Sequence, residues 1–381
     1  MSFLITCAAL LAGCGDDAAT DTAGGPPAIE LEIEDLGDFT LSDTGWYSDE
    51  IAMTVPEGTV STMFSCGAYG SNALGSVYDL ADPTGTAVYN GDDPSLWPGY
   101  RSETLDDLAT GLLPLTPDLD TSPGTWNARW FVSAGNGGAT VHCAAVHRVD
   151  TVSENATAQV NLVFVGLSGL NGLDATTAPN DPNFQAALTV FEAEWASGNL
   201  SPTFSYADFS GDANTYATVD ISDDDASEFN ELLATVDSAN PRAITFFFVQ
   251  EIANENGTTI LGLSGGPPGA AATNGTSKSG VVVTTLDITT SPESVGKIMA
   301  HEGGHFLGLF HTSEGNASNH DLLSDTPECP ITADANLNGQ LNSDECEGMG
   351  AENVMWWTLT TGDATLSDDQ SWVLVRNPAV D

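Results

Sequence analysis

The stretch that most constrains this chain is HEGGHFLGLFH, residues 301–311, which carries three of the six histidines. His301 and His305 are four residues apart, so on a helix they lie about 400° of rotation and roughly 6 Å of rise from each other, on one face. Two imidazoles at this spacing can share one Zn²⁺ at Zn–N distances of about 2.0–2.1 Å. Glu302, between them, is placed to act as a general base toward a water on the open side of the metal.

The third histidine joins this site only if the helix ends before it. A continuous helix would carry His311 about 9 Å further along the axis than His305, too far to share a metal. Glycine adopts a positive φ without steric cost, and Gly308 lies where such a turn is needed. We therefore predict a turn at Gly308 and a third zinc ligand in His311. The alternative is an apolar helix whose histidines are ordinary core residues.

The whole pattern resembles the zinc motif of the metzincin metalloproteases, which carry a methionine turn some tens of residues downstream. In this chain ENVMWW places Met355 after the motif. The segment HDLLSDTPECP (320–330), with its Asp-Thr-Pro at 325–327, is similar to the pappalysin (cytophagalysin) branch. The resemblance covers roughly residues 157–381.

The resemblance implies a metzincin-like zinc protease domain in which Met355 forms a structural floor below the metal. One position departs from the family pattern: Trp357 stands where these proteins usually have a tyrosine. No role of that tyrosine is therefore carried over to this chain.

The N-terminus reads as an export signal. Residues 1–14, MSFLITCAALLAGC, form an apolar run too short to span a bilayer, and no other segment reaches about 18 consecutive apolar residues. The end of this run resembles a bacterial lipobox, which implies lipidation at Cys14; an ordinary secretory signal is the alternative. Residues 15–28 are small, acidic and rich in Gly and Pro, which predicts a flexible tether. We expect an exported lipoprotein of the cell envelope or outer surface, or a form released from it.

Acidic residues dominate the charge: 54 Asp and Glu stand against 7 Lys and Arg, for a net charge of −47. Such a chain has no basic patch to release counterions, which argues against nucleic-acid partners and against membrane contact other than a lipid anchor. The acidity fits an ordinary soluble exported protein, a solvation shell suited to salty surroundings, or a set of calcium sites.

Residues 29–150 predict an all-β sandwich. Short runs with alternating, β-branched or aromatic residues are separated by Gly, Pro and Asp clusters. The expected strands are 29–34, 50–55, 61–66, 76–80, 86–90, 125–133 and 139–147. A linker follows at about 150–157.

Residues 157–381 alternate strands and helices, which predicts an α/β layered domain with the metal at the edge of the sheet. The expected strands are 159–167, 202–209, 215–222, 243–252 and 279–287, with a long loop at 256–278. Helices are expected after the cap Asp181-Pro182, over 225–237, after Ser291-Pro292, and after a capping box from Ser367 to Gln370.

Four cysteines remain once Cys7 and Cys14 are assigned to the signal, two on each side of the linker. Export permits disulfides, so we predict the pairs Cys66–Cys143 and Cys329–Cys346. The alternative is that Cys66 or Cys143 caps the zinc as a latency thiolate.

Residues 334–345, DANLNGQLNSDE, match the calcium loop of EF-hands. Gly339 would make the sharp turn and Leu341 the apolar anchor. The expected oxygen ligands are Asp334, Asn336, Asn338, the carbonyl of Gln340, Asn342 through a water, and bidentate Glu345. The alternative is an Asn- and Gly-rich turn without a metal.

Together these features predict a multidomain, exported zinc-dependent endopeptidase that hydrolyses protein or peptide substrates, with zinc as catalytic and calcium as structural cofactor. One rival is a non-catalytic, calcium-dependent surface or adhesion lipoprotein with a relic protease domain. A second is a zinc amidohydrolase that is not proteolytic.

Overall fold

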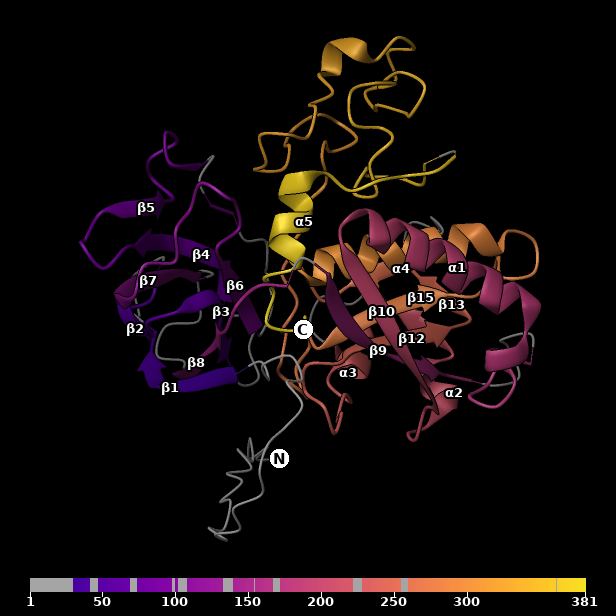
Figure 1. Cartoon of the computed structure of the whole chain (residues 1–381), viewed down its shortest axis with the longest axis horizontal. Coiled ribbons are helices and arrows are strands. Elements are labelled where there is room, and N and C mark those ends of the chain that lie inside the picture. Colours follow the sequence, from indigo (N-terminus) through magenta and orange to yellow (C-terminus); the bar gives the residue numbers. More distant parts are fainter. Residues whose placement is uncertain are drawn as a thin grey trace, which may run out of the picture.

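The structure is a computed structural model. It describes residues 30–41, 47–68, 74–97, 100–101, 108–132, 140–153, 155–166, 172–221, 228–254, 260–360 and 362–381. The predicted signal, tether and lipidation site at Cys14 lie outside the described residues. Figure 1 shows a β-rich N-terminal part beside an α/β part, with a loop-rich lobe above them.

The N-terminal part is a β-sandwich of two four-stranded antiparallel sheets. One sheet has the order β1 (Glu30–Thr40), β8 (Thr140–Val149), β3 (Thr59–Ala68), β6 (Leu108–Leu113). The other has the order β2 (Ile51–Val55), β7 (Gly124–Val132), β4 (Leu74–Ala81), β5 (Ala87–Asn90). Alternate side chains fill the space between them; β2, for example, alternates buried and exposed residues along its length.

The α/β part is built on a five-stranded sheet. Its order is β10 (Leu200–Asp208), β9 (Ala156–Phe164), β12 (Ile244–Val249), β15 (Gly280–Thr284), β14 (Gly262–Ser264). Only β14 runs antiparallel to its neighbour, and it forms the edge next to β15. A short pair, β11 (Thr218–Asp220) and β13 (Glu251–Ala253), stands apart from this sheet.

Helices cover both faces of the central sheet (Figure 1). On one face lie α1 (Pro182–Ser197) and α4 (Pro292–Phe306), and on the other lies α3 (Glu228–Leu233). The short helices α2 (Ala213–Tyr216) and α5 (Asp368–Leu374) are the remaining two in the described residues. In β12, Phe246 and Phe248 belong to the core that also holds α1 and α4 residues, while Phe247 and Val249 belong to a second core with α3. A strand buried on both faces is rich in apolar residues, and in β12 Thr245 is the one polar residue among six buried ones.

The structure corrects four expectations. A strand at 108–113 was missed, and 215–222 divides into α2 and the short β11 instead of one strand. The run 243–252 splits into β12 and β13, and the expected loop 256–278 contains the edge strand β14. In addition, the helix expected over 225–237 ends early: α3 covers 228–233, residues 234–237 are turn and coil, and 222–227 lie outside the described residues. The β14 segment begins with a glycine and is followed by another, and glycine is uncommon inside strands, so the sequence does not indicate a strand there.

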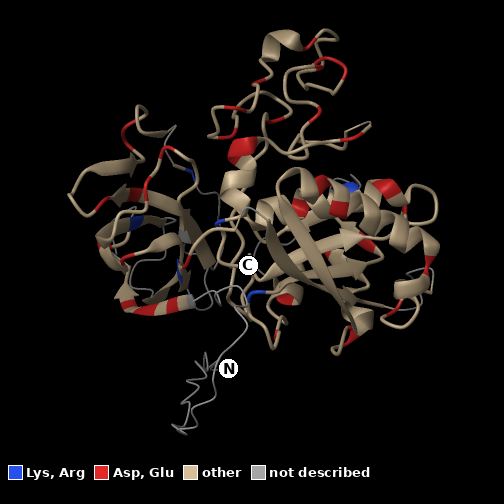
Figure 2. Ribbon diagram, in the orientation of Figure 1, with Lys and Arg blue, Asp and Glu red and all other residues tan. Residues whose placement is uncertain are grey.

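Acidic side chains are spread over every part of the molecule, and basic ones are few (Figure 2). Within the described residues, no helix combines the length and the apolar character needed to cross a membrane.

Candidate metal centre

Helix α4 carries the first two histidines, as predicted, and packs along α1; the indole nitrogen of Trp195 in α1 donates to the carbonyl of Ala300 at 3.2 Å. The helix begins at Pro292, whose fixed φ suits the first turn. Ser291 precedes it as the N-cap residue, but its side chain makes no capping hydrogen bond.

The helix ends in the turn that the sequence predicts. Gly308 has a φ of +105°. The amide of Leu309 donates to the carbonyl of Gly304 at 2.9 Å, and the amide of Gly308 donates to that of His305 at 2.9 Å. These two bonds form a Schellman arrangement, in which glycine at the left-handed position reverses the chain. The reversal carries His311 back toward α4.

The three histidines converge through their Nε2 atoms. His305 Nε2 lies 3.1 Å from that of His301 and 3.0 Å from that of His311, and the remaining pair is 3.2 Å apart. Three nitrogens at about 2.05 Å from a tetrahedral zinc would be about 3.3 Å from one another, close to the observed separations. Of the His, Cys, Asp and Glu side chains among the described residues, this trio forms the group arranged to hold a metal ion.

The other ring nitrogen of each histidine has an oxygen partner. His301 Nδ1 lies 2.8 Å from the carbonyl of Val354, and His305 Nδ1 lies 2.7 Å from that of Leu309. His311 Nδ1 lies 3.0 Å from a carboxylate oxygen of Glu314.

An oxygen acceptor at Nδ1 fixes the proton on that nitrogen and leaves Nε2 with its lone pair. The three facing Nε2 atoms then have no proton to share, so they cannot be hydrogen-bonded to each other. Burial lowers the pKa of His301 to about 4, with the neighbouring His311 acting in the same direction. Burial likewise lowers the pKa of His305. Three neutral imidazoles with converging lone pairs fit a zinc ion.

Glu302 lies between α4 and the edge strand β14. A Cβ atom on Gly262 would lie 2.7 Å from Cγ of Glu302, so a side chain at this position would displace the glutamate. Burial raises the pKa of Glu302 to about 8, and a backbone hydrogen bond from Ser264 acts in the opposite direction. A carboxylate whose pKa is raised in this way is a stronger base than an exposed one.

Met355 packs against α4 at Gly304. It is fully buried, and its sulfur would be 2.4 Å from a Cβ atom on Gly304, so α4 and the methionine meet without room for another side chain. The carbonyl of Met355 accepts from the amide of Thr312 at 3.0 Å, which ties this segment to the residue after His311.

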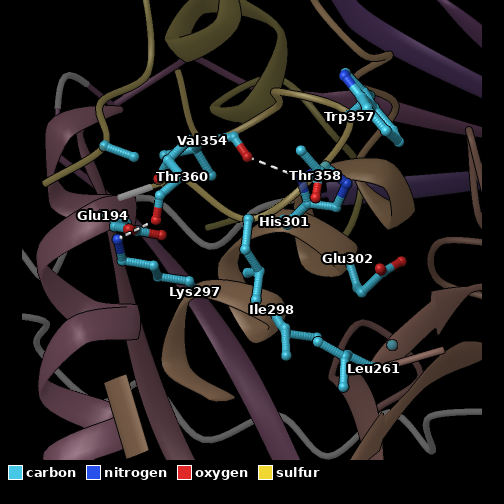
Figure 3. A pocket seen from close by; sticks show the side chains of 13 residues that line it. Glu194, Leu261, Lys297, Ile298, His301, Glu302, Val354, Trp357, Thr358 and Thr360 are labelled. Carbon is cyan, nitrogen blue, oxygen red and sulfur yellow. Dashed lines mark hydrogen bonds between the residues drawn. The ribbon is translucent and has the colours of Figure 1, made fainter. Parts of the chain in front are cut away.

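A pocket of about 210 Å³ opens beside His301 and Glu302 (Figure 3). Its apolar lining comes from α4, from the residue before β14 and from the residues on either side of Met355 in the sequence: Leu261, Ile298, Val354, Leu359 and Ala364. Glu194 and Lys297 lie together at the far side in Figure 3. Lys297 Nζ donates to the carbonyls of Thr360, at 2.9 Å, and Gly362.

Glu194 is a buried carboxylate that the sequence did not reveal. It is 5% exposed, and its Oε1 atom has no hydrogen-bond partner. Burial raises the pKa of Glu194 to about 7, while the charge of Lys297 opposes the shift.

Trp357, at the position of the family tyrosine, lines the pocket and donates its indole N–H to the carbonyl of Leu341 at 3.0 Å. The amide of Leu341 donates to the carbonyl of Gly315 at 2.6 Å. The buried Leu341 therefore joins the loop 334–345 to the wall of the pocket.

In the loop 334–345 the side-chain oxygens accept from the loop's own amides. Asp334 accepts from Gly339 N at 2.8 Å, and Glu345 Oε1 accepts from Ala335 N at 3.0 Å and from the Asn336 amide nitrogen at 3.1 Å. Gly339 has a φ of +81°, the sharp turn expected there. The loop is folded as a closed turn around Asp334, which is 8% exposed.

Both disulfides join the cysteines that the sequence pairs. Cys66 and Cys143 lie opposite each other in β3 and β8, and Cys329 joins Cys346 below the loop 334–345. Asp325 of the Asp-Thr-Pro segment accepts from the Ser367 hydroxyl at 2.8 Å and the Asp369 amide at 2.9 Å, so it holds the start of α5. The capping box at Ser367 is present as predicted.

Sequence reasoning missed Glu314, Glu194 and the edge strand. Glu314 follows His311 by three residues, a spacing that could have suggested a partner for the third imidazole. Nothing in the sequence around Glu194 distinguishes it from Glu192, which lies exposed on the same helix.

The comparisons with known proteins give one partial sequence match. Over 72 residues the chain is 35% identical to "Extracellular metalloprotease 1" of Coccidioides posadasii (strain C735), covering 17% of this chain and 22% of that protein. The chain thus matches about a fifth of the length of this curated relative. No model of a known protein family matches the chain.

Two solved structures show only a low overall similarity to this chain. Metalloproteinase-II from Bacteroides fragilis has a TM-score of 0.33 and 16% identity, covering 60% of this chain and 55% of that one. A family two carbohydrate esterase from Cellvibrio japonicus has a TM-score of 0.17 and 11% identity, covering 60% and 82%.

Proposed function

We propose that this protein is an exported zinc-dependent endopeptidase. The observation that carries the proposal is the trio of Nε2 atoms 3.0–3.2 Å apart, with each Nδ1 held by an oxygen acceptor and Glu302 alongside. His301, His305 and His311 would hold the ion. The partial similarity to an extracellular metalloprotease supports the same class of activity.

A zinc ion bound there would lower the pKa of water and polarise a carbonyl. Glu302 would accept a proton from the attacking water at its carboxylate and deliver it to the nitrogen of the leaving amine. Burial raises the pKa of Glu302, so only its ionised fraction can accept the proton at neutral pH, and the charge of a zinc ion nearby would favour that ionised form. Met355 has no part in the chemistry; it supports α4 from below.

An extended peptide could lie along β14, because among the described residues this strand pairs along its length only with β15. Addition of a strand to a free sheet edge satisfies the backbone of the peptide and leaves alternate side chains to enter pockets. The pocket beside His301 would take one of these side chains. Most of its lining residues belong to α4 or to the segment after Met355.

The finer assignments form part of the proposal. The spacing of the zinc motif, Met355 and the Asp-Thr-Pro segment support a metzincin-like domain of pappalysin type over residues 157–381, beside a sandwich over 29–150. Two disulfides support an oxidising, exported environment. A lipid anchor at Cys14 follows from the lipobox resemblance.

We propose calcium as a structural cofactor at 334–345. The motif supplies five side chains with oxygens and a carbonyl, and the loop already has the glycine turn and the buried apolar anchor of such sites. Asp334, Asn336, Asn338 and Glu345 would turn from the loop amides to the ion, with Gln340 contributing its carbonyl.

Digestion of a peptide library by the zinc-loaded protein tests the proposed activity. We expect cleavage at internal peptide bonds, loss of cleavage when a chelator removes the metal, and recovery on addition of zinc. Zinc-loaded protein, freed of any propeptide, that cleaves no peptide or protein would reject the endopeptidase assignment and favour the binding-protein alternative.

A further inference from the structure

We propose that one sheet of the sandwich, β1-β8-β3-β6, together with the segments that flank β6, braces the turn that brings His311 to the metal. The brace consists of Arg101, Thr110, Leu112, Leu115 and Arg148. On this view the N-terminal part supports the metal centre and is not a separate binding module. The inference rests on the proposed metal site, although its test does not require peptidase activity.

The first contact is made at the turn itself. A Cβ atom on Gly308 would lie 2.8 Å from Cδ2 of Leu112 and 3.6 Å from Cδ2 of Leu115. Both leucines are almost fully buried, at 1% and 3% exposure. The left-handed residue that reverses the chain is therefore packed directly against the end of β6 and the residues after it.

The second contact holds the neighbouring loop. The buried hydroxyl of Thr110 in β6 donates to the carbonyl of Pro268 at 2.7 Å. The adjacent Gly269 donates its amide to the carbonyl of Phe306, the last residue of α4, at 2.9 Å. The sandwich is thus linked to the C-terminal end of α4 through a loop that is hydrogen-bonded to β6 on one side and to α4 on the other.

The third contact lies outside His311. Arg101 stacks over the ring of Phe310, with 4.8 Å between its Cζ atom and the ring centroid, and donates to the carbonyl of His320 at 3.1 Å. The charge of Arg101 also interacts with Glu314, the carboxylate that accepts from His311 Nδ1. An arginine of the N-terminal part therefore packs on the residue before His311, and its charge favours the ionised form of the carboxylate beside the His311 ring.

The fourth contact reaches the turn from the C-terminal segment. Arg148 of β8, fully buried, donates to the carbonyls of Val375 at 2.8 Å and Asn377 at 3.2 Å. The side chain of Asn377 donates in turn to the carbonyl of Leu307 at 3.0 Å. Leu307 immediately precedes Gly308. The sandwich therefore contacts the turn directly, through Leu112 and Leu115, and indirectly, through Arg148 and Asn377.

The chain has a net charge of −47 and only seven Lys and Arg residues, and two of them, Arg101 and Arg148, belong to this contact surface. Partners that orient metal-binding imidazoles typically contribute about 10–100-fold to metal affinity. A turn that had to order itself without the sandwich would lose part of this effect, because the chain around His311 would sample other conformations.

The test compares brace variants with matched sandwich variants in the full-length chain. Leu112→Ala is paired with Leu80→Ala, an equally buried leucine in the other sheet. Arg101→Ala is paired with Arg129→Ala, which also loses an arginine stacked on an aromatic ring. The readouts are zinc affinity by chelator competition, hydrogen exchange of the 303–311 amides in metal-free protein, and the melting temperature of each variant.

We expect zinc affinity to fall about 10-fold or more in Leu112→Ala and Arg101→Ala, with faster exchange at 303–311. The controls should keep zinc affinity within about twofold at a similar loss of melting temperature. Equal zinc affinity and equal exchange in brace and control variants would overturn the inference. If no variant and no wild-type protein takes up zinc, the proposed function fails, and the exchange comparison still decides the brace.

Discussion

At the scale of single residues, the metal centre depends on the acceptors behind the histidines as much as on the histidines themselves. Two acceptors are backbone carbonyls, of Val354 and Leu309, and one is the carboxylate of Glu314. The sequence could predict which histidines come together, because only a few residue types bind zinc and their spacing restricts how they can meet. It could not predict the carbonyl partners, because every residue carries a carbonyl and only the fold selects one.

Glu194 provides a residue-scale prediction. Its pKa is raised by burial, from an ordinary value of 4.5 to about 7, so the folded state holds the proton more tightly than the unfolded state. The stabilising effect of this proton is fully present below about pH 4.5 and is lost as the pH rises through about 7. Glu194→Gln, which cannot ionise, should therefore be more stable than wild type by roughly 1–3 kcal/mol at pH 8 and equally stable near pH 4.

Denaturant unfolding between pH 4 and pH 8 measures this difference, with the exposed Glu192→Gln on the same helix as control. A gain in Glu194→Gln that is the same at every pH, or is matched by Glu192→Gln, would show that ionisation of Glu194 does not destabilise the fold.

At the scale of elements, caps and turns were the most predictable features. The Asp181-Pro182 start of α1, the Gly308 turn and the capping box at Ser367 each follow from the geometry of a few backbone groups. The edge strand β14 was missed because it has three residues between glycine-rich turns and takes its pattern from β15. Local sequence determines how a helix ends, whereas a short edge strand exists only because a neighbour is there to pair with it.

The loop 334–345 gives an element-scale prediction. Asp334→Ala removes a ligand expected for Ca²⁺, so with zinc present in both buffers it should lower the melting temperature more in calcium-containing buffer than in calcium-free buffer, where only its hydrogen bonds to the loop amides are lost. The difference arises because an ion that binds only the folded state stabilises that state by mass action. Asp344→Ala, an exposed carboxylate in the same loop, is the control. Equal melting shifts for Asp334→Ala with and without calcium would count against a calcium site.

At the scale of the whole molecule, the charge is the dominant property. With 54 acidic and 7 basic residues, the acidic residues seen along the ribbon in Figure 2 repel one another in the compact state. Some of the few basic residues are used at internal junctions: Arg148 and Arg242 both hold carbonyls of the C-terminal segment. These arginines thus join segments that are distant in the sequence.

Repulsion of this kind predicts a response to salt. Raising the ionic strength from about 0.01 M to about 0.15 M shortens the Debye length from about 30 Å to about 8 Å, so the melting temperature should rise over this range. Thermal melts in NaCl and in KCl measure it, and the two salts should act alike if screening is the cause. A flat or falling melting temperature would mean that long-range repulsion has little effect on this fold.

The central claim, that Glu302 acts as the general base beside a zinc ion on three histidines, is tested most directly by Glu302→Gln. The substitution keeps the shape of the side chain but removes its ability to accept a proton, and general-base catalysis is typically worth about 10²–10⁴-fold. We predict that kcat for peptide hydrolysis falls by at least about 10²-fold. Zinc content should stay at about one ion per chain, because the three imidazoles are untouched. His311→Ala, the companion variant, should lose zinc affinity as well as activity. Peptide hydrolysis that survives Glu302→Gln at the wild-type rate would contradict the mechanism.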